Sequence, residues 1–267
     1  MKYLFDHLPE IKRSVEKRPV ALFLDYDGTL TPIAPTPDQA LLPVTAKNVL
    51  LKTIKMPGIR TAIVSGRALE DVRRLIGIKD LIYVGNHGFE IRGAGLEFES
   101  LISPSYKQLL AGIKSEIDDT LAGFSGVLME DKGVTLSIHY RLSPVPSHGE
   151  LVQMIEKILR PYVERKELCM TTGKMVIEIR PPIVWDKGKA VLWVMKRLQF
   201  ISEAASILPI CIGDDVTDED TFFAVKDIGI TVRVGKTDKT QASYFVENPE
   251  DVIIFLEYIL KVKSYDS

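Results

Sequence analysis

The sequence predicts an α/β protein: a doubly wound, Rossmann-like parallel-sheet core with a smaller α/β unit inserted into it. Near both ends of the chain, short apolar strands alternate with amphipathic helices, the pattern of a parallel sheet covered by helices on both faces. In the middle of the chain, strands follow strands, as in an antiparallel sheet. We therefore expect residues 1–100 and 181–267 to form the core, and residues 101–180 to form the inserted unit.

The first core segment contains apolar runs too short for helices, which we interpret as buried strands, and longer runs with helical periodicity. Pro57-Gly58 and Gly77 provide the helix stops. The expected order is strand 20–24, helix 44–56, strand 60–64, helix 68–76 and strand 81–84.

The inserted unit contains two long amphipathic stretches and two pairs of short strands. Asp131-Lys132-Gly133 and Gly173 are typical of turns between paired strands, and Pro181-Pro182 closes the unit. The expected order is helix 106–121, strands 127–129 and 134–140, helix 150–162, and strands 168–172 and 174–179.

The second core segment resumes the alternation of the first, which is why the middle unit is interpreted as an insertion. The expected order is helix 187–198, strand 207–212, helix 218–225, strand 228–234 and helix 249–261.

The composition indicates a globular protein without a general affinity for anions. The 267 residues include 34 basic and 36 acidic side chains, a formal charge of −2, and 46% are hydrophobic. This balance provides no field that would attract nucleic acid or anionic lipid. No apolar run approaches the roughly 18 residues of a membrane span, and charged residues interrupt the amino-terminal segment, so we expect no signal peptide. We expect a cytoplasmic monomer that acts on a small molecule, without membrane or nucleic-acid partners.

The two cysteines, Cys169 and Cys211, are far apart in the sequence and imply neither a disulfide framework nor a metal cluster. We interpret both as buried apolar residues.

Two carboxylates, Asp25 and Asp27, follow the first strand at its carboxyl end, where open parallel sheets bind ligands. Extended geometry points both to the same side of the chain, where they repel each other when ionised. A cation relieves this repulsion, and Mg²⁺ prefers carboxylate oxygens together with water and substrate phosphate. The pair therefore predicts a magnesium site and phosphoryl chemistry.

A second acidic cluster follows the predicted strand 207–212. Glu219 and Asp220 are explained by a helix start, where acidic residues favour the helix dipole. That explanation does not extend to Asp214 and Asp215, which precede the helix at a strand end. We expect them to close the other side of the metal site.

Three further segments have residue types suited to phosphate. Ser65-Gly66-Arg67 places a hydroxyl and backbone amides ahead of a helix, although Ser65 as a simple helix cap is the alternative. Gly85-Asn86-His87-Gly88 allows close backbone approach to a ligand, and a plain turn is the alternative. Lys187, at a helix start where a positive charge opposes the dipole, would neutralise the carboxylates, and a solvated surface lysine is the alternative.

Taken in order, these pieces resemble the four motifs of the haloacid dehalogenase-like phosphatase superfamily. The segment from Asp25 to Thr29 is similar to the first motif, Ser65 to the second, Lys187 to the third, and Gly213-Asp214-Asp215 to the fourth. More narrowly, the chain resembles the trehalose-6-phosphate phosphatases, in particular at Tyr26, Ile33, Ser65-Gly66-Arg67, Gly85-Asn86-His87-Gly88 and Glu178-Ile179-Arg180-Pro181. Members of that family have an α/β cap between the second and third motifs, where the inserted unit lies.

The resemblance implies Mg²⁺-dependent hydrolysis of trehalose 6-phosphate through an aspartyl-phosphate. It makes Asp25 the nucleophile, and Asp27 the general acid and then the general base. It implies that Mg²⁺ binds the Asp25 carboxylate, the Asp27 backbone carbonyl and Asp214, supported by Asp215 or Asp218. Ser65 and Lys187 would hold the phosphoryl oxygens.

The resemblance also implies substrate contacts from both units. In the core these are Gly28, Gly66, Arg67, Asn86 and His87, although for Arg67 an exposed arginine at a helix start is the alternative. In the cap, Lys174, Glu178 and Arg180 alternate along one strand and so share a face that can bind sugar hydroxyls and phosphate. A solvated strand face is the alternative for these three, and His139 and Arg141 share a face in the same way.

Other activities fit the same motifs. Phosphatases that act on mannosyl- or glucosyl-phosphoglycerate, and phosphosugar mutases, share the superfamily and the cap type. A phosphosugar-binding regulator is the non-enzymatic alternative, but it would need neither the nucleophile nor the acid.

Overall fold

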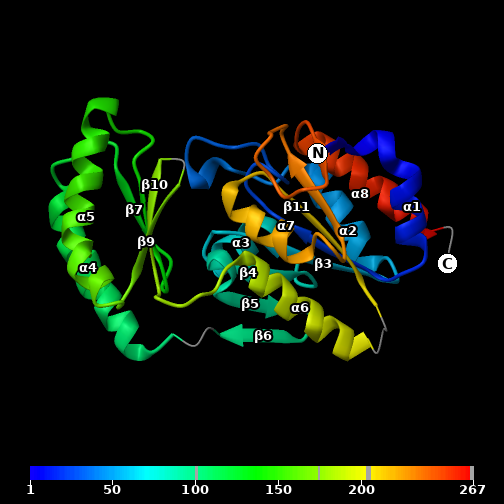
Figure 1. Cartoon of the computed structure of the whole chain (residues 1–267), viewed down its shortest axis with the longest axis horizontal. Helices are drawn as coiled ribbons and strands as arrows, with labels where there is room; N and C mark the ends of the chain where they lie inside the picture. Colours follow the sequence, from blue (N-terminus) through cyan, green and yellow to red (C-terminus); the bar gives the residue numbers. More distant parts are fainter. Residues whose placement is uncertain (100–101, 174, 203–205, 265–267) are drawn as a thin grey trace. The chain divides into compact units, whose positions relative to one another are not determined.

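The computed structural model describes residues 1–99, 102–173, 175–202 and 206–264 (Figure 1). The chain divides into two compact units, Met1–Phe98 with Trp185–Ser267 and Glu99–Val184. Among the described residues, no helix combines the length and the apolar character needed to cross a membrane.

The larger unit is built on one mixed sheet, to which the described residues contribute nine strands. In sheet order they are β1 (Lys2–Tyr3), β13 (Tyr244–Val246), β12 (Ile230–Val234), β11 (Leu208–Gly213), β2 (Val20–Leu24), β3 (Ile59–Val64), β4 (Ile82–Gly85), β5 (Glu90–Gly93) and β6 (Leu96–Glu99). Neighbours from β1 to β4 run parallel, so the carboxyl ends of β11, β2, β3 and β4 meet at one edge. The predicted α/β class is confirmed.

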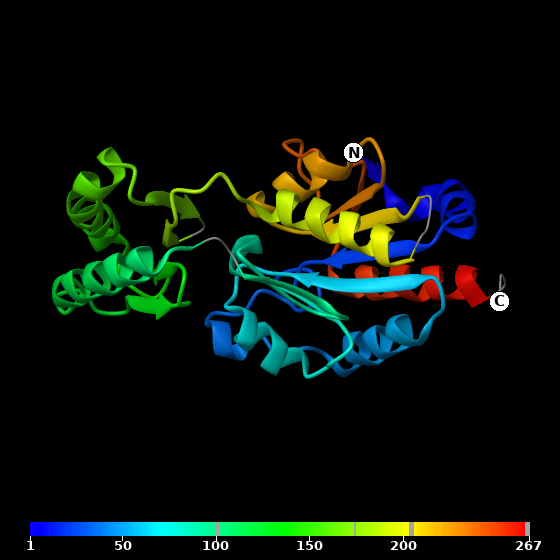
Figure 2. The ribbon, with the colours of Figure 1, turned by 90° about the horizontal axis from the view of Figure 1, so that it is seen from below.

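Helices cover both faces of this sheet because side chains alternate along each strand. In β2, Leu22 and Leu24 face one core, and Ala21 and Phe23 face the other. Of the helices in the described part of the chain, four pack on the first face and two on the second, so that α6 and α8 lie on opposite sides of the sheet (Figure 2). The first four are α1 (Leu8–Glu16), α2 (Val44–Lys55), α3 (Leu69–Ile76) and α8 (Pro249–Ser264), and the other two are α6 (Lys187–Ser202) and α7 (Glu219–Val225).

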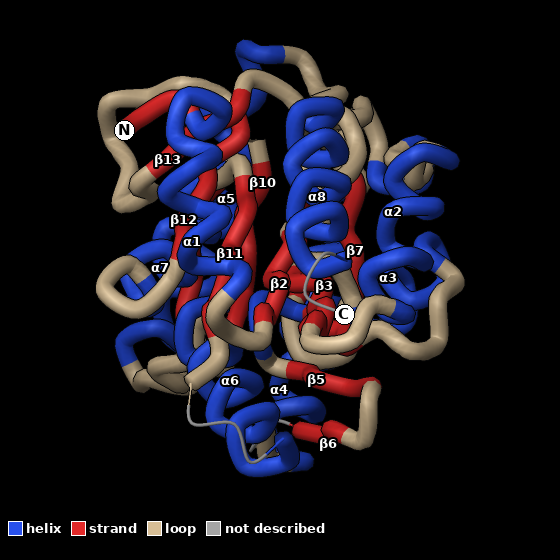
Figure 3. The backbone as a smooth tube through the Cα atoms, turned by 90° about the vertical axis from the view of Figure 1, so that its right-hand side faces the viewer, coloured by secondary structure: helices blue, strands red, loops and turns tan. Residues whose placement is uncertain are grey.

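Four strands of this sheet, β1, β13, β5 and β6, were not predicted from the sequence. β1 and β13 are short edge strands, and β1 pairs with β13 beside the amino terminus (Figure 3). β5 pairs antiparallel with β4, so the sheet is not purely parallel. Only Ala94 and Gly95 separate β5 from β6, and both have positive φ, 50° and 78°, as a tight hairpin turn requires. Alanine seldom adopts that conformation.

The smaller unit has two layers. Its sheet has the order β7 (Leu128–Asp131), β8 (Leu136–His139), β10 (Val176–Arg180) and β9 (Cys169–Gly173), with every neighbouring pair antiparallel. Its helices α4 (Pro104–Leu121) and α5 (His148–Glu164) cover one face of that sheet (Figure 1). Ile177 and Ile179 of β10 are buried in this core, which turns the alternating Glu178 and Arg180 to the opposite face.

Two predictions in this unit need correction. Gly173 is the last residue of β9 and pairs directly with Val176, so it belongs to the strand rather than to the turn. Cys211 is buried but Cys169 is exposed, because it begins the edge strand β9 and pairs with Arg180 of the polar face.

Candidate active site

Asp25 and Asp214 come together because their strands are parallel neighbours. β2 ends at Leu24 and β11 at Gly213, and the Asp25 amide continues the ladder by donating to the Ile212 carbonyl at 2.9 Å. Carboxylate oxygens of Asp25, Asp214 and Asp218 all lie within 4.8 Å of one another. The parallel register therefore joins two acidic motifs that are almost 190 residues apart in the sequence.

Lys187 connects this cluster to helix α6. Its Nζ lies 2.8 Å from Asp25 Oδ1 and 2.8 Å from Asp218 Oδ1, and its side chain is 3% exposed. The next residue, Gly188, permits this placement, because a Cβ there would lie 2.3 Å from the Asp220 carbonyl oxygen. Close packing of α6 against the start of α7 thus brings the lysine to the carboxylates.

Asp218 holds the acidic loop in place. Its Oδ2 accepts hydrogen bonds from the amides of Asp214 and Asp215 at 3.1 and 3.0 Å, while its Oδ1 accepts from Lys187. Asp215 and Asp218 also form a capping box at the start of a short 3-10 helix, Val216–Asp218. Because both oxygens of Asp218 accept from protein donors, Asp218 is suited to supporting the site, and Asp25 and Asp214 are better suited to binding a cation.

Burial and neighbouring charges shift the pKa values of Asp25 and Lys187 in this cluster. Burial raises the pKa of Asp25 well above its ordinary value, the like charge of Asp218 adds to this, and Lys187 acts in the opposite direction. Burial lowers the pKa of Lys187, but the carboxylates of Asp218 and Asp25 outweigh that effect and raise it above its ordinary value. The ammonium is therefore charged at neutral pH, while ionised Asp25 requires further positive charge nearby.

The donor set fits a hard divalent cation such as Mg²⁺, which takes carboxylate and carbonyl oxygens. The backbone at Asp27 and Gly28 lies against this acidic cluster, because a Cβ on Gly28 would lie 2.4 Å from Asp214 Oδ2. Gly28 also has a φ of +81°. A side chain at this position would collide with the acidic cluster.

The Asp27 carboxylate is paired with Arg67. Arg67 Nε lies 2.7 Å from Asp27 Oδ2, and Nη2 lies 2.6 Å from Oδ1. The Asp27 side chain is 40% exposed, whereas that of Asp25 is 8% exposed. The two acids of the first motif therefore occupy different environments, although they are separated by one residue.

Backbone hydrogen bonds join the loops that follow β3 and β4. The Asn86 amide donates to the Arg67 carbonyl at 2.7 Å, and the His87 amide donates to the Ser65 carbonyl at 3.1 Å. The His87 ring packs against Gly66, where a Cβ would lie 2.4 Å from it. Asn86 and His87 have positive φ, 49° and 56°, a strained conformation that surrounding contacts must hold. The two loops form one unit beside Ser65, which is itself buried.

The smaller unit has its own charged cluster on the open face of its sheet. Arg180 donates to Glu178, and Lys132 Nζ lies 3.8 Å from carboxylate oxygens of both Glu178 and Glu130. His139 Nε2 lies 3.0 Å from Glu130 Oε2. Lys174, which the sequence places with Glu178 and Arg180, lies outside the described residues, and Arg141 is exposed beyond the end of β8.

Sequence reasoning missed Arg233 and Lys132. Arg233, the penultimate residue of β12, pairs with Gly213 and donates to the carbonyls of Asp214 and Asp215 and to Glu219, so it anchors the acidic loop. The sequence shows only an arginine near the end of a strand, and the parallel register is what brings it beside the loop. The sequence pattern places Lys132 only in a turn, but its side chain is 5% exposed and lies between the carboxylates of Glu130 and Glu178.

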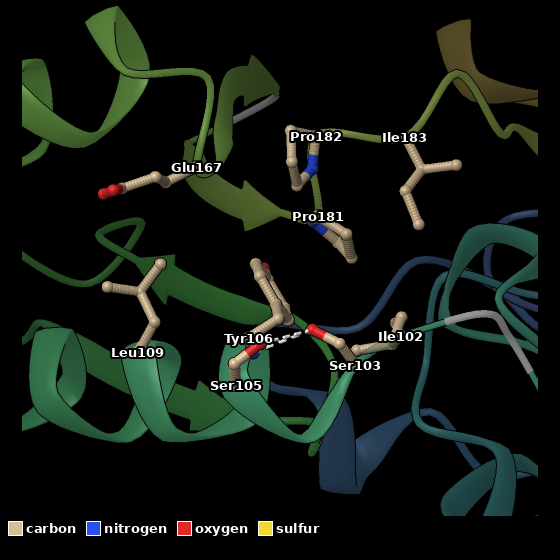
Figure 4. Close-up of a pocket in the computed structure, with 9 residues that line it drawn as sticks. All are labelled: Ile102, Ser103, Ser105, Tyr106, Leu109, Glu167, Pro181, Pro182 and Ile183. Carbon is tan, nitrogen blue, oxygen red and sulfur yellow. Dashed lines mark hydrogen bonds between the residues drawn. The ribbon is translucent and has the colours of Figure 1, made fainter.

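A cavity of about 480 Å³ lies in the smaller unit beside the start of α4 (Figure 4). Tyr106 lines it, and the Tyr106 hydroxyl is buried with no hydrogen-bond partner among the described residues. The full lining is Ile102, Ser103, Ser105, Tyr106, Leu109, Glu167, Pro181, Pro182 and Ile183. None of the site residues predicted from the sequence belongs to it.

Comparisons with known proteins agree over most of the chain. The model of the trehalose-phosphatase family matches residues 23–250. The chain is 32% identical over 266 residues to trehalose-phosphate phosphatase B of Arabidopsis thaliana, covering 95% of this chain and 70% of that protein. It is 35% identical over 249 residues to the trehalose-phosphate phosphatase of Mycobacterium tuberculosis (strain H37Rv), covering 91% and 62%. Among solved structures, the trehalose-6-phosphate phosphatase C-terminal domain of C. albicans matches with a TM-score of 0.77 and 25% identity, covering 95% of this chain and 96% of that domain.

Proposed function

Because this chain belongs to the trehalose-phosphatase family, we propose that it hydrolyses trehalose 6-phosphate to trehalose and phosphate through an aspartyl-phosphate on Asp25. The observation that carries the proposal is the buried cluster in which Lys187 bridges Asp25 and Asp218 beside Asp214. A phosphosugar-binding regulator would need neither the nucleophile Asp25 nor the acid Asp27.

In the first step, an oxygen of Asp25 forms a bond to phosphorus, and the bond from phosphorus to the sugar oxygen breaks. Asp27 donates its proton to that leaving oxygen. In the second step, Asp27 takes a proton from water, the water oxygen bonds to phosphorus, and the carboxylate of Asp25 leaves. Phosphate is then free, and both aspartates return to their starting states.

The remaining core residues hold the phosphoryl group. Lys187 places its ammonium between the nucleophile and the acidic loop, where negative charge develops in the transition state. The Ser65 hydroxyl and the Gly66 amide donate to phosphoryl oxygens, while Asn86 and His87 keep the Ser65 loop in shape. The Gly28 amide donates to the Thr31 carbonyl at 2.8 Å, so Gly28 contributes close backbone approach rather than a hydrogen bond. Because phosphoryl transfer depends mainly on positioning and charge, these groups together with a bound metal ion suffice.

The Asp25 carboxylate, Asp214 and the Asp27 carbonyl would hold Mg²⁺, with Asp215 and Asp218 ordering the loop. When bound, the ion supplies positive charge that keeps Asp25 ionised and offsets the charge of the phosphoryl group.

Removal of divalent cations should abolish phosphate release from trehalose 6-phosphate, and excess Mg²⁺ should restore it. Since burial disfavours the charge on Asp25, Mg²⁺ should also raise the melting temperature of the wild type. Phosphate release and thermal melts, each with chelator and with Mg²⁺, measure both effects. Asp214→Asn is the matched control, whose melting temperature should no longer respond to Mg²⁺. Full activity in chelator would contradict the metal assignment.

A panel of sugar phosphates tests the substrate. We expect phosphate release from trehalose 6-phosphate to exceed release from glucose 6-phosphate and from mannosyl- and glucosyl-phosphoglycerate. Release confined to a phosphoglycerate would favour the related phosphatases, and isomer interconversion without free phosphate would favour a mutase. Calorimetric binding without turnover, in excess Mg²⁺, would favour a phosphosugar-binding regulator.

We further propose that the inserted unit is the cap that recognises the sugar, through Glu178 and Arg180 of its charged face together with Lys174. Glu178→Gln should raise KM for trehalose 6-phosphate roughly tenfold with little change in kcat, since a charged acceptor for sugar hydroxyls is lost. Steady-state kinetics measure this, and Glu156→Gln, on the exposed surface of α5, is the control. An unchanged KM in a folded Glu178→Gln variant would exclude the contact.

A further inference from the structure

We propose that Arg67 is a positioning residue that holds the ionised Asp27 carboxylate in the orientation in which it takes the proton from water, with the Tyr26 ring packed against the guanidinium. The inference rests on the proposed function, in which Asp27 performs the proton transfers. It differs from the expectation that Arg67 binds the substrate phosphate.

The contact between Arg67 and Asp27 is bidentate. Nε and Nη2, on one edge of the guanidinium, reach the two carboxylate oxygens at 2.7 and 2.6 Å. A paired contact of this kind fixes both the distance and the plane of the carboxylate. Asp27 needs such a restraint, because its side chain is 40% exposed and lies in a loop after the strand. Without it, the carboxylate would sample several rotamers.

Arg67 is itself held from several sides. Its guanidinium carbon lies 5.4 Å from the centroid of the Tyr26 ring, and its side chain is only 12% exposed. Its amide donates to Ser65 Oγ at 3.1 Å, and its carbonyl accepts from the Asn86 amide at 2.7 Å. The guanidinium is therefore fixed in position, and so are the two nitrogens that donate to Asp27.

Tyr26 is a rigid platform for this arginine. It is fully buried, and its hydroxyl donates to the Ala40 carbonyl at 2.7 Å. Burial raises the pKa of Tyr26 to about 12, with Arg67 acting in the opposite direction, so the phenol keeps its proton. The arrangement gives Tyr26, the residue between the two acids of the first motif, a physical role: its ring supports the arginine that orients the second acid.

A phosphate ligand and a positioning residue predict different kinetics. If Arg67 acts through Asp27, Arg67→Gln should lower kcat for trehalose 6-phosphate by about 10- to 100-fold, the range expected for a misplaced catalytic group. KM and the inhibition constant of inorganic phosphate should stay within about twofold. Arg67→Lys, which keeps the charge but loses the fork, should recover only part of kcat. Arg74→Gln, which removes an exposed ion pair on α3, should behave as wild type.

The effect should also depend on Asp27. In an Asp27→Asn background, Arg67→Gln should cause no further loss of kcat, because residues that act as a unit are not additive. Melting temperatures establish that each variant folds, and Arg67→Lys provides the comparison if Arg67→Gln does not fold.

Three results would overturn the inference. The first is a rise in KM and in the phosphate inhibition constant with kcat retained, which identifies a phosphate ligand. The second is an unchanged kcat, and the third is a loss that multiplies with that of Asp27→Asn. Failure of the proposed function is distinguishable, because it would appear as a wild-type protein that releases no phosphate from trehalose 6-phosphate. The variants would then be compared on whichever phosphate ester the wild type hydrolyses.

Discussion

Asp25→Asn should abolish phosphate release, with kcat reduced by at least about 10⁴-fold, the scale of loss when a covalent nucleophile is removed. The amide is nearly isosteric with the carboxylate but cannot form the aspartyl-phosphate. Phosphate release at saturating trehalose 6-phosphate and Mg²⁺ measures the effect. Retention of more than a small fraction of wild-type kcat would exclude Asp25 as the nucleophile.

The same substitution should not destabilise the protein in the absence of Mg²⁺. The pKa of Asp25 is raised in the folded state, so stability from its protonated form is present below its unfolded pKa of about 3.9 and is lost as pH rises through the folded value. Above that unfolded pKa and without a cation, Asp25 therefore opposes folding, and asparagine removes that cost.

Thermal melts in chelator measure this effect. The melting temperature of Asp25→Asn should equal or exceed that of the wild type, by a margin that grows as pH is raised from about 5 to 8. A variant that melts well below wild type across this range would mean that the hydrogen bond from Lys187 to Asp25 outweighs the burial of the charge.

Lys187→Met should remove both activity and a large part of the stability. Lys187 is the cation that bridges Asp25 and Asp218, and both carboxylates are at least nine-tenths buried. Removal of one partner from a buried charge pair costs about 3–5 kcal/mol, because it leaves uncompensated charge in a medium of low polarity. Denaturant unfolding in chelator measures the free energy of unfolding, and phosphate release measures activity.

The neighbouring Lys189 provides the control for this prediction. Its ion pair with Asp186 joins side chains that are 40% and 31% exposed, so Lys189→Met should change the free energy of unfolding by less than about 1 kcal/mol. The double variant Asp25→Asn/Lys187→Met should regain part of the stability lost in Lys187→Met, because one of the two repelling charges is gone. A Lys187→Met protein as stable as wild type would mean that the two carboxylates share a proton instead.

The main strands of the core could be predicted because each is a short apolar run bounded by glycine, proline or charge. Residues 20–24 match β2 residue for residue. Edge strands could not be predicted in the same way. β1 has two residues and β13 three, and each depends on hydrogen bonds to a neighbour that the local sequence does not reveal.

In the candidate site, too, single residues could be predicted from the sequence, but their contacts could not. The carboxylates at strand ends and the lysine at a helix start can each be recognised in the sequence, since phosphoryl chemistry restricts which residue types can act at those positions. Asp215 and Asp218 were not distinguishable, however, because both are acidic and both precede α7. Only the fold shows that Asp218 reaches Lys187 and two loop amides.

The sequence by itself determined which groups this protein has for phosphoryl chemistry: the Asp25 and Asp27 pair, Ser65, Lys187 and the acidic loop at Asp214, in an order that resembles one family. Tertiary structure alone decided how those groups are paired. Asp25 is joined to Lys187 and Asp27 to Arg67, although the two aspartates are separated by a single residue. The physical reason is that these ion pairs join residues 40 and 162 positions apart, and only the parallel register of the sheet and the packing of α6 bring them within bonding distance.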